Sequence, residues 1–306
     1  MVYELIIVGG SASAVAAGIY AARRKLNFII ISKDFGGEVA NSGEIENYPG
    51  FVKTTGIELS EKFKKHLASH NVFPETGIEV KNIKQENNRF ILEADKIGKA
   101  VVYEAKSVII ATGVRPRQLG IPGEEKFRGK GVSYCTVCDG PLFRNKIVAT
   151  IGGGNSALES VLMLSQIASK VYLITINSEL AGENTLIDKV KADKKIEIIC
   201  NVNTKKIIGE QLGGGLEYKE KESSQTKRLK VDGIFVHIGH LPNSQMVDLT
   251  EKNKFGEIIV DRLGQTNIGG LFAAGDVTDI PYKQIAIATG MGVTAALSAV
   301  SYLNSN

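Results

Sequence analysis

The amino-acid sequence predicts an α/β protein in which one strand–turn–helix–strand pattern occurs twice. The first copy begins at the N-terminus and carries the glycine-containing turn Gly9–Ala14. The second copy begins near the middle of the chain and carries the turn Gly152–Ala157. A third feature, the spacing of Cys135 and Cys138 two residues apart, lies just before the second copy. These three observations predict both the fold class and the chemistry.

The first copy consists of a buried strand at residues 3–8, a small-residue helix at Val15–Lys25 and a second strand at Phe28–Ser32. A glycine-rich turn in this setting is typical of dinucleotide binding. Gly9 and Ala14 fit that pattern, but Ser11 replaces the second glycine. Because a Cβ at this position hinders a pyrophosphate from approaching the backbone, the first turn alone is a weak signal.

The second copy has strands at Ile147–Ile151 and Lys170–Thr175 on either side of a helix at Leu158–Ala168. Its turn contains three consecutive glycines, Gly152–Gly154. Two such units in one chain form an internal repeat, which is far stronger evidence than either unit alone. We therefore predict two Rossmann-like, three-layer dinucleotide-binding domains.

Each domain is expected to carry a small antiparallel meander. Period-two alternation over Glu79–Glu104 predicts the first meander, and strands at Lys205–Ile208 and Gly215–Lys219 contribute to the second. A strand at Ser107–Thr112 closes the first domain, and the breakers in Arg115–Gly120 indicate a boundary. A crossover back to the first domain is expected at Pro242.

Cys135, Cys138 and Asp139 are the candidate catalytic residues. A Cys-x-x-Cys turn brings two sulfurs close enough to form a disulfide and lowers the pKa of one thiol. Asp139 adds a carboxyl group that could donate or accept a proton. Half of a zinc site is the alternative, but structural zinc needs four ligands. Elsewhere the chain offers only Cys200 and four scattered histidines, so the pattern favours redox chemistry.

Composition narrows the functional class further. The 306 residues carry a net charge of +4, and no cluster of Lys and Arg is dense enough to indicate nucleic-acid binding. We expect no signal peptide, because Glu4 interrupts the apolar N-terminus, and no apolar run of bilayer-spanning length. Three cysteines, two of them in a redox pair, are typical of a reducing cytosol.

The C-terminal segment suggests a site for an electron-rich ring. Residues Gly270–Asp276 read as a strand that delivers an acid to its carboxyl end, where ligands bind in open α/β sheets. A long helix of small residues follows Gln284, and its N-terminus would present unpaired N–H groups to a reduced flavin. By contrast, His237 and His240 near a strand end are more typical of a structural role.

The motifs together resemble the low-molecular-weight thioredoxin reductases. They are Glu46–Gly50, Ala111–Gly113, Tyr134–Phe143, Gly152–Ser156, Phe272–Val277 and Pro281–Ile285. The Pro-Leu-Phe after the cysteines and the Pro-Tyr-Lys-Gln run resemble the flavoprotein component of alkyl hydroperoxide reductase most. For the two N-terminal thioredoxin-like domains of that component, this sequence has no residues.

The resemblance implies a homodimeric flavoenzyme with FAD and NADH or NADPH as cofactors. It implies a discontinuous FAD domain at residues 1–117 and 243–306, and an inserted pyridine-nucleotide and disulfide domain at 118–242. The family alternates two domain orientations, and we expect the hinges near 115–120 and 240–243. By resemblance, Cys138 faces the flavin, Cys135 attacks the partner's disulfide and Asp139 protonates the departing thiolate.

The resemblance also assigns the cofactor residues. Those expected to bind FAD are Gly9, Ser11, Ala12, Ser13, Gly37, Glu38, Asn47, Ala111, Thr112, Gly113, Gly275, Asp276, Lys283, Gln284 and Ile285. Asp276 would hold the ribityl chain, and Gln284 and Ile285 would begin the helix under the ring. Those expected to bind NAD(P) are Gly152, Gly154, Asn155, Ser156, Thr175 and Glu179.

The electron donor is the point where the sequence departs from the family. NADPH-dependent members carry an arginine cluster after the second strand of the inserted domain, and here that run is Thr175–Glu179, without arginine. We therefore expect NADH first, NADPH second and reduced ferredoxin third. A dithiol oxidase and a non-enzymatic redox sensor are the other hypotheses. As a reductase, this cytoplasmic protein would act on a thioredoxin-like or glutaredoxin-like protein and could feed a peroxiredoxin.

Overall fold

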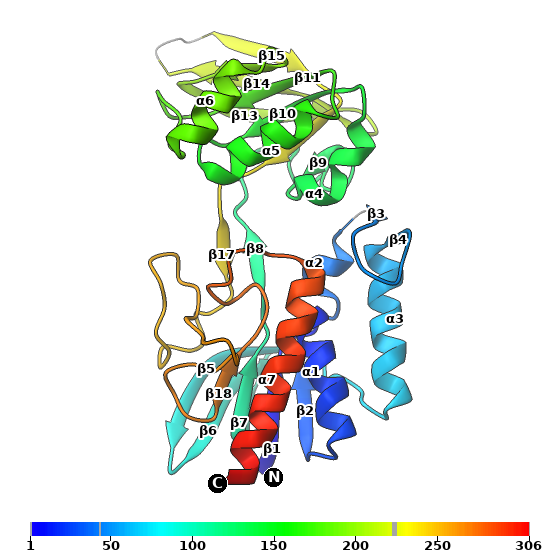
Figure 1. Ribbon diagram of the computed structural model, residues 1–306, viewed down its shortest axis with the longest axis vertical. Coiled ribbons are helices and arrows are strands. Elements are labelled where there is room, and N and C mark those ends of the chain that lie inside the picture. The colour runs from blue at the N-terminus through cyan, green and yellow to red at the C-terminus, as the bar shows by residue number, and fades with distance from the viewer. Residues whose placement is uncertain (1, 43, 222–224, 306) are drawn as a thin grey trace. The chain divides into compact units, whose positions relative to one another are not determined.

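The computed structural model describes residues 2–42, 44–221 and 225–305, which form two compact units (Figure 1). The first unit comprises Met1–Arg115 and Leu241–Asn306, and the second comprises Pro116–His240. The chain therefore passes twice between the units. At these crossings β8 (Val114–Pro116) and β17 (His240–Pro242) pair with each other as a two-stranded ladder.

The first unit is built on a six-stranded sheet. Its parallel part consists of β2 (Phe28–Ile31), β1 (Val2–Val8), β7 (Lys99–Ile110) and β18 (Leu271–Ala273). The long strand β7 also continues into an antiparallel meander with β6 (Arg89–Lys96) and β5 (Ile78–Glu86). A single strand thus joins the parallel sheet to the meander.

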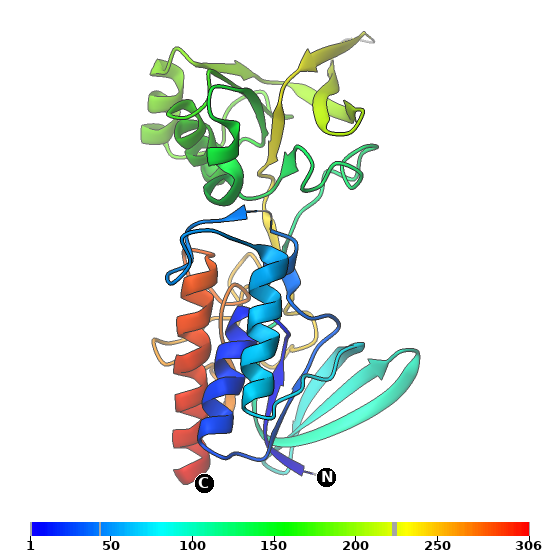
Figure 2. The ribbon, with the colours of Figure 1, turned by 90° about the vertical axis from the view of Figure 1, so that its right-hand side faces the viewer.

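The helices of the first unit cover one face of the parallel strands. In Figure 2, α1 (Ala12–Arg23), α3 (Gly56–Ser69) and α7 (Ile285–Ser305) lie side by side. The short helix α2 (Gly37–Ala40) and the two-residue strands β3 (Glu44–Ile45) and β4 (Thr54–Thr55) complete this side. Alternating residues of β1 explain the layering: Leu5 and Ile7 pack against α1 and α7, whereas Ile6 and Val8 pack against the meander side.

The second unit repeats this plan. Its five-stranded parallel sheet has the order β12 (Ile196–Ile199), β11 (Lys170–Ile174), β10 (Ile147–Ile151), β16 (Gly233–Val236) and β9 (Val132–Ser133). Alternate residues of β10 again face opposite layers. Val148 packs against the helices α5 (Asn155–Ser165) and α6 (Asn184–Ala192), and Ala149 packs against the meander. The meander is β13 (Val202–Gly209), β14 (Gly213–Glu220) and β15 (Thr226–Lys230).

The predicted fold class is confirmed: both units are Rossmann-like and each carries an antiparallel meander. Several details differ, among them a missed strand and the starts of both first helices, with α5 beginning at Asn155 rather than at Leu158. The strand β15 is rich in lysine and arginine because it is an exposed edge strand, so no apolar alternation marked it. The first helix begins at Ala12 rather than at Val15, since Ser11 in extended conformation precedes it as N-cap.

The expectation that no apolar run is long enough to span a bilayer is wrong for α7. By its length and composition alone, this helix could cross one. This helix has 21 residues and a mean hydropathy of 1.5. Core helices of water-soluble proteins pass the same test, and Gly292 of α7 packs tightly on α1. A Cβ at Gly292 would lie 2.1 Å from the carbonyl oxygen of Ser13. The helix is therefore part of the packed first unit.

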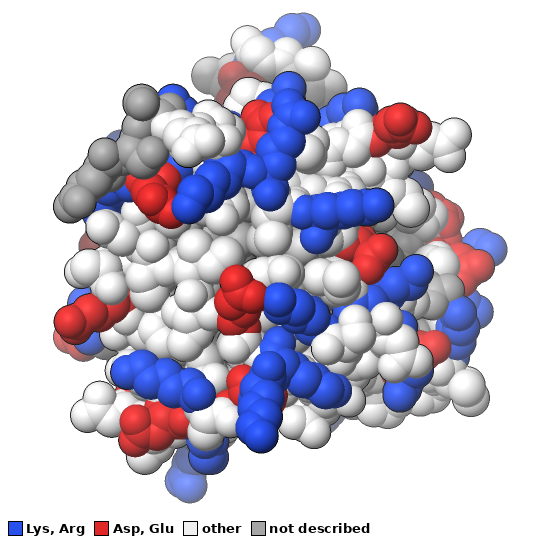
Figure 3. Space-filling view, turned by 90° about the horizontal axis from the view of Figure 1, so that it is seen from above, with Lys and Arg blue, Asp and Glu red and all other residues white. Residues whose placement is uncertain are grey.

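Charged side chains are mixed on the face drawn in Figure 3. Lys and Arg side chains there are interspersed with Asp, Glu and uncharged residues. Several of the ion pairs in the structure are exposed cross-strand pairs, such as Lys84–Glu93 and Arg228–Glu217. Exposed pairs of this kind contribute little to stability, so the fold depends on its two apolar layers.

One turn in the first unit is strained. The two-residue turn between β6 and β7 places Ile97 at φ 52° and Gly98 at φ 80°. A β-branched residue is disfavoured at positive φ, and the Ile97 side chain is 82% exposed, so little packing offsets the strain. The turn between β5 and β6 has the same backbone signs but uses Asn87 and Asn88.

We predict that Ile97→Asn stabilises the protein by about 1 kcal/mol and raises the melting temperature by roughly 2–4 °C. The reason is relief of left-handed strain at a position where asparagine is tolerated. Scanning calorimetry measures the shift. The matched variant Asn88→Ile should shift the temperature in the opposite direction, and an unchanged or lowered melting temperature for Ile97→Asn would contradict the interpretation.

Candidate functional site

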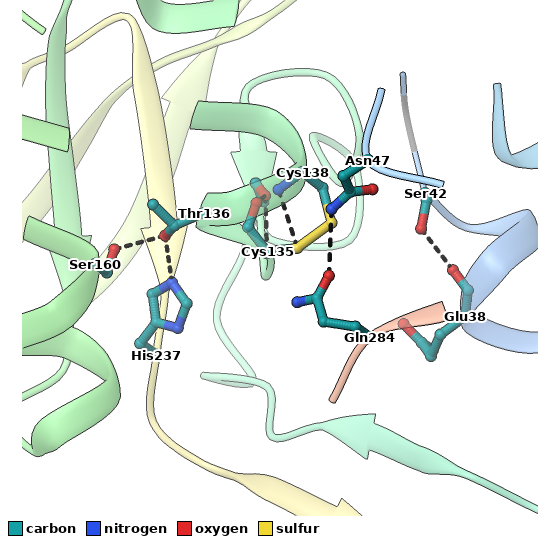
Figure 4. The surroundings of a disulfide bond; sticks show 10 residues. Glu38, Ser42, Asn47, Cys135, Thr136, Cys138, Ser160, His237 and Gln284 are labelled. Atoms are coloured by element: carbon teal, nitrogen blue, oxygen red, sulfur yellow. Dashed lines mark hydrogen bonds between the residues drawn. A yellow bond between two sulfur atoms is a disulfide. The ribbon is translucent and has the colours of Figure 1, made fainter. Parts of the chain in front are cut away.

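The cysteine pair lies at the start of the one-turn helix α4 (Thr136–Asp139), which follows β9. Cys135 and Cys138 form a disulfide, drawn in Figure 4, with their Cα atoms 5.3 Å apart. The backbone N–H of Cys138 donates to the Sγ of Cys135 at 3.2 Å. Within the described ranges no three His, Cys, Asp or Glu side chains are grouped as metal ligands.

Asp139 is placed next to this disulfide by the backbone. Its N–H donates to the carbonyl oxygen of Cys135 at 3.0 Å. Burial raises the pKa of the Asp139 carboxyl above its ordinary value, and a hydrogen bond with Ser133 partly opposes this. Its Oδ1 atom has no hydrogen-bond partner among the described residues. The site therefore places a carboxyl group with a raised pKa and one unpartnered oxygen beside the disulfide.

The first glycine turn leads from β1 into α1 and leaves no room for a side chain at Gly9. A Cβ at Gly9, whose φ is 138°, would lie 2.1 Å from the carbonyl oxygen of Ala111. Ser11 is accommodated because its backbone is extended and its hydroxyl donates to the carbonyl oxygen of Gly36 at 2.6 Å. The helix that follows has no acidic residue in its first turn. Its N-terminus therefore keeps its attraction for an anion.

The other expected FAD residues gather around this turn. Ser13 lies against Gly275, where an added Cβ would come within 2.9 Å of the Ser13 Oγ. The hydroxyl of Thr112 donates to the carbonyl oxygen of Asn243 at 2.5 Å, and the Asn243 amide donates back to the Thr112 carbonyl at 2.9 Å. These contacts hold Ala111–Gly113 against the segment that re-enters the first unit.

Asp276 follows β18, and the helix α7 begins at Ile285 shortly after it. Burial raises the pKa of Asp276 to about 6, while the charge of Lys283 acts in the opposite direction. Asp276 Oδ1 has no hydrogen-bond partner in the described part of the chain. The amide of Asn47 donates to Gln284 Oε1 at 3.2 Å (Figure 4), which joins two expected residues far apart in sequence.

Two residues that are expected to bind FAD, Lys283 and Glu38, make hydrogen bonds or ion pairs within the protein. The amine of Lys283 donates to the Thr278 carbonyl at 2.6 Å and forms an ion pair with Glu257 at 2.9 Å. Glu38 lies in the short helix α2, beside Gly37, and its carbonyl accepts a hydrogen bond from Ser42. These contacts order the loops around the first turn.

The second glycine turn has the same construction as the first. A Cβ at Gly152, whose φ is 151°, would lie 2.2 Å from the carbonyl oxygen of His237. Gly154 is the N-cap of α5, whose first turn includes Asn155 and Ser156 and contains no acidic residue. The Asn155 amide is held by Glu183, to which it donates at 3.1 Å. This turn is therefore shaped to receive a second anionic ligand.

The residues that are expected to determine specificity for NADH or NADPH follow the end of β11. Thr175 is buried, and its hydroxyl accepts a hydrogen bond from the Asn177 N–H at 3.3 Å. Glu179 is exposed in the loop that follows. No arginine or lysine occurs between Thr175 and Asn184. A 2′-phosphate would therefore find no cation within this loop.

The sequence pattern of the pyridine nucleotide-disulphide oxidoreductases matches residues 3–292. The chain belongs to this family. It is also similar in structure to the thioredoxin reductase of Streptococcus pyogenes MGAS5005, with a TM-score of 0.92 and 35% identity over 100% of this chain and 99% of that one. The resemblance to the low-molecular-weight thioredoxin reductases is thereby confirmed.

Two curated relatives are longer proteins. The F component of the alkyl hydroperoxide reductase of Staphylococcus aureus strain Mu50 is 41% identical over 305 residues, which are 99% of this chain and 60% of that protein. A protein named NADH dehydrogenase from Ferdinandcohnia aciditolerans is 37% identical over 99% of this chain and 58% of its own length. The chain thus spans about three fifths of the curated relatives it matches.

The residues present fit the cofactors that the family implies, FAD and NAD(P)H. For FAD, the unpartnered Oδ1 of Asp276 can accept a hydrogen bond from a ligand hydroxyl, and the acid-free N-termini of α1 and α7 suit a pyrophosphate and a reduced ring. For the nucleotide, the Gly152 turn and the acid-free N-terminus of α5 serve the same purpose.

Several residues of these sites were missed from the sequence. Asn243 orders the Thr112 turn, Glu257 engages Lys283, and Glu183 holds Asn155. Glu124 is buried and accepts hydrogen bonds from the Leu119 and Gly120 N–H groups and from the Tyr134 hydroxyl. Each acts across a long sequence separation or inside a loop, where no periodic pattern marks it.

We predict that Asp276 makes the flavin-free protein less stable as the pH rises. Because its folded pKa of about 6 exceeds the ordinary value of 3.8, its favourable contribution is complete below pH 3.8 and is lost as the pH passes 6. Relative to Asp276→Asn, wild type should lose on the order of 2–3 kcal/mol of unfolding free energy between pH 4 and 7.

Urea unfolding across this pH range measures the difference. Asp248→Asn, at a carboxyl side chain that is 94% exposed in the same unit, is the control and should follow wild type. Parallel curves for wild type and Asp276→Asn would show that burial does not hold the pKa of Asp276 high.

Proposed function

We propose that this chain is a flavin-dependent protein-disulfide reductase of the thioredoxin reductase type. Electrons would pass from NADH through FAD to the Cys135–Cys138 disulfide, and from there to a thioredoxin-like protein. The observation that carries the proposal is a disulfide directly followed by a carboxyl group whose buried Oδ1 has no partner among the described residues, in a unit that also bears a nucleotide-type glycine turn. Because the curated relatives are longer, the activity is proposed for this chain and not transferred from them.

The proposal divides the two cofactors between the units. Residues 1–117 and 243–306 form the FAD domain, since they hold the Gly9 turn, Asp276 and the start of α7. Residues 118–242 form the pyridine-nucleotide and disulfide domain. When bound between these residues, FAD would supply hydride acceptance from a nicotinamide and two-electron transfer to a disulfide. The protein residues then supply orientation, nucleophile and proton.

Cys135 is proposed as the thiolate that attacks the substrate disulfide. Its attack forms a mixed disulfide, and Cys138 then attacks the Cys135 sulfur and releases the reduced substrate. The Cys138 N–H, 3.2 Å from the Cys135 Sγ, would favour the thiolate form because hydrogen bonds to charged acceptors are the stronger ones. Asp139, with its raised pKa, would give its proton to the departing thiolate.

NADH is the proposed donor. The loop after Thr175 contains no arginine or lysine that could pair with a 2′-phosphate, and one relative bears the name NADH dehydrogenase. Glu179 is proposed to approach the ribose hydroxyls, as an acid near this strand end does in other Rossmann domains. Operation as a dithiol oxidase is not favoured, since the relatives reported from Staphylococcus aureus and Streptococcus pyogenes are reductases by name. Ferredoxin ranks below the nucleotides as a donor because the second unit keeps the Gly152 turn.

The assembly and partner are also proposals. We propose a homodimer, because α7 contains no charged residue and most of its residues are not fully buried within one chain. Sedimentation equilibrium would test this, and a monomer at micromolar concentration would contradict it. We propose a cytoplasmic location because the cysteine usage is typical of a reducing compartment. The partner would be a thioredoxin-like or glutaredoxin-like protein that supplies a peroxiredoxin, rather than a nucleic acid or a membrane.

Steady-state reduction of a thioredoxin with each nucleotide tests the function. We predict that kcat/KM with NADH exceeds that with NADPH by at least about tenfold, since an unpaired 2′-phosphate loses roughly 1.4 kcal/mol or more of binding. Replacing Cys135 or Cys138 by serine should abolish disulfide reduction while NADH still bleaches the flavin. Equal use of both nucleotides would contradict the donor, and an unbleached flavin would contradict the reductase.

Asp139→Asn should slow turnover of the protein disulfide by about 10²-fold without slowing reduction of the flavin by NADH. Turnover should slow because asparagine cannot supply the proton that the aspartic acid donates, although its side chain is still polar. Stopped-flow absorbance separates the two half-reactions. Asp188→Asn, at an exposed position of α6, is the control. Equal slowing of both half-reactions would indicate a structural role for Asp139.

A further inference from the structure

A buried cluster of polar side chains lies beneath the redox-active turn. The hydroxyl oxygen of Thr136 is 2.6 Å from the Ser160 Oγ and 2.8 Å from the His237 Nε2, and both contacts are drawn in Figure 4. Ser160 Oγ is in turn 3.4 Å from the Thr150 hydroxyl. Thr136, Ser160 and Thr150 are at most 5% exposed, and His237 is largely buried.

The cluster joins four elements of the second unit. Thr136 belongs to α4, Thr150 to β10 and Ser160 to α5, and His237 directly follows β16. The second glycine turn connects β10 to α5. The cluster is therefore a side-chain link between the disulfide and the elements that carry this turn.

Thr136 lies between the two cysteines, so its hydroxyl is the attachment of the redox turn to this cluster. The helix α4 has only four residues, and a single helical turn is not stable by itself. In the oxidised protein the disulfide also closes the turn. Once the S–S bond is broken, the contacts of Thr136 remain to hold Cys135 and Cys138 close together.

His237 is itself fixed at the second glycine turn. The backbone N–H of His237 donates to the Ile151 carbonyl at 2.8 Å. The backbone carbonyl of His237 occupies the space that a Cβ on Gly152 would need. Burial, with a smaller contribution from the charge of His240, lowers the pKa of His237 to about 4. The imidazole is therefore neutral near pH 7, and it can donate to or accept from the Thr136 hydroxyl.

We propose that His237 is a positioning residue for the redox pair, which through Thr136 keeps the reduced dithiol in the geometry of the disulfide and so makes it a stronger reductant. The inference rests on the proposed function, in which the pair cycles between the two states. Reduction breaks the S–S bond and adds two electrons and two protons to give two thiols. The electrons come from NADH in the proposed cycle.

The direction of the effect follows from conformational freedom. The disulfide restrains the turn in the oxidised state whether or not the cluster is intact. In the reduced state the cluster restrains the turn together with local contacts such as the hydrogen bond from the Asp139 N–H to the Cys135 carbonyl. Loss of the cluster removes part of this restraint, so the dithiol can relax and its free energy falls relative to that of the disulfide. Variants without the Thr136–His237 contact should therefore be easier to reduce and should be poorer reductants.

The test is the equilibrium of the full-length chain with mixtures of reduced and oxidised dithiothreitol at pH 7, without nucleotide or protein partner. Acid quenching, alkylation and mass spectrometry count the thiols, and Cys200 adds the same constant label in every sample. We expect Thr136→Val and His237→Leu each to shift the equilibrium constant toward the dithiol by about three- to tenfold. A tenfold shift equals about 30 mV for this two-electron couple.

Matched variants distinguish positioning from general damage. Thr136→Ser and His237→Gln keep a hydrogen-bonding group and should stay within about twofold of wild type. The double variant Thr136→Val with His237→Leu should shift no further than Thr136→Val alone, because that change already removes the contact that His237→Leu removes. Thr204→Val, at a buried threonine of β13 in the same unit, should leave the equilibrium unchanged.

The inference is overturned if Thr136→Val stays within twofold of wild type, if Thr204→Val shifts equally, or if the single shifts add in the double variant. Should His237→Leu not fold, Thr136→Val decides alone, since it keeps the shape of threonine. The readout needs no turnover, so an inactive protein with the expected shift contradicts only the proposed function. An active reductase without the shift contradicts only the inference.

Discussion

Both halves of this protein depend on a close approach between a strand-to-helix turn and the backbone of a neighbouring strand. At Gly9 and at Gly152 a Cβ atom would lie 2.1 and 2.2 Å from the carbonyl oxygens of Ala111 and His237. Glycine at these two positions lets β1 and β10 run directly into α1 and α5, so that the helix N-termini meet the carboxyl edges of the parallel sheets. Such edges are where open α/β sheets bind their ligands, and neither helix has an acid in its first turn to neutralise the positive end of its dipole.

Two acids lie near these edges, and we propose that they take part in the chemistry. Asp276 follows β18 in the first unit, and Asp139 follows the cysteine pair in the second. Each has one carboxylate oxygen without a hydrogen-bond partner among the described residues, and burial raises the pKa of both. An unpartnered buried oxygen is costly unless a ligand or a reacting group satisfies it. The same physical feature thus supports a cofactor contact in one unit and a proton donor in the other.

The sequence was sufficient where the signal is local. The two glycine turns, the Cys135–Cys138 pair and the Gly275–Asp276 strand end are each encoded within a few adjacent residues, and the resemblance of their motifs gave the family correctly. It was insufficient where contacts join distant segments. Thr136 and His237 are 101 positions apart, and Thr112 and Asn243 are 131 apart. The sequence predicts a structural role for His237, but no local pattern connects this residue to the cysteines. Ser11 counted against dinucleotide binding in the sequence, yet its hydroxyl bonds the Gly36 carbonyl and is accommodated.

The proposed function requires the Cys135–Cys138 disulfide to exchange electrons with the flavin. The disulfide then accepts two electrons in addition to the two that the flavin accepts. Anaerobic titration of the flavin-loaded protein with dithionite tests this requirement most directly, because the titration counts electrons without requiring a nucleotide or a partner. The account predicts that wild type takes up four electrons per flavin and that the double variant of Cys135→Ser and Cys138→Ser takes up two. Uptake of two electrons by both proteins would contradict it, since the Cys135–Cys138 bond would then exchange no electrons with the flavin.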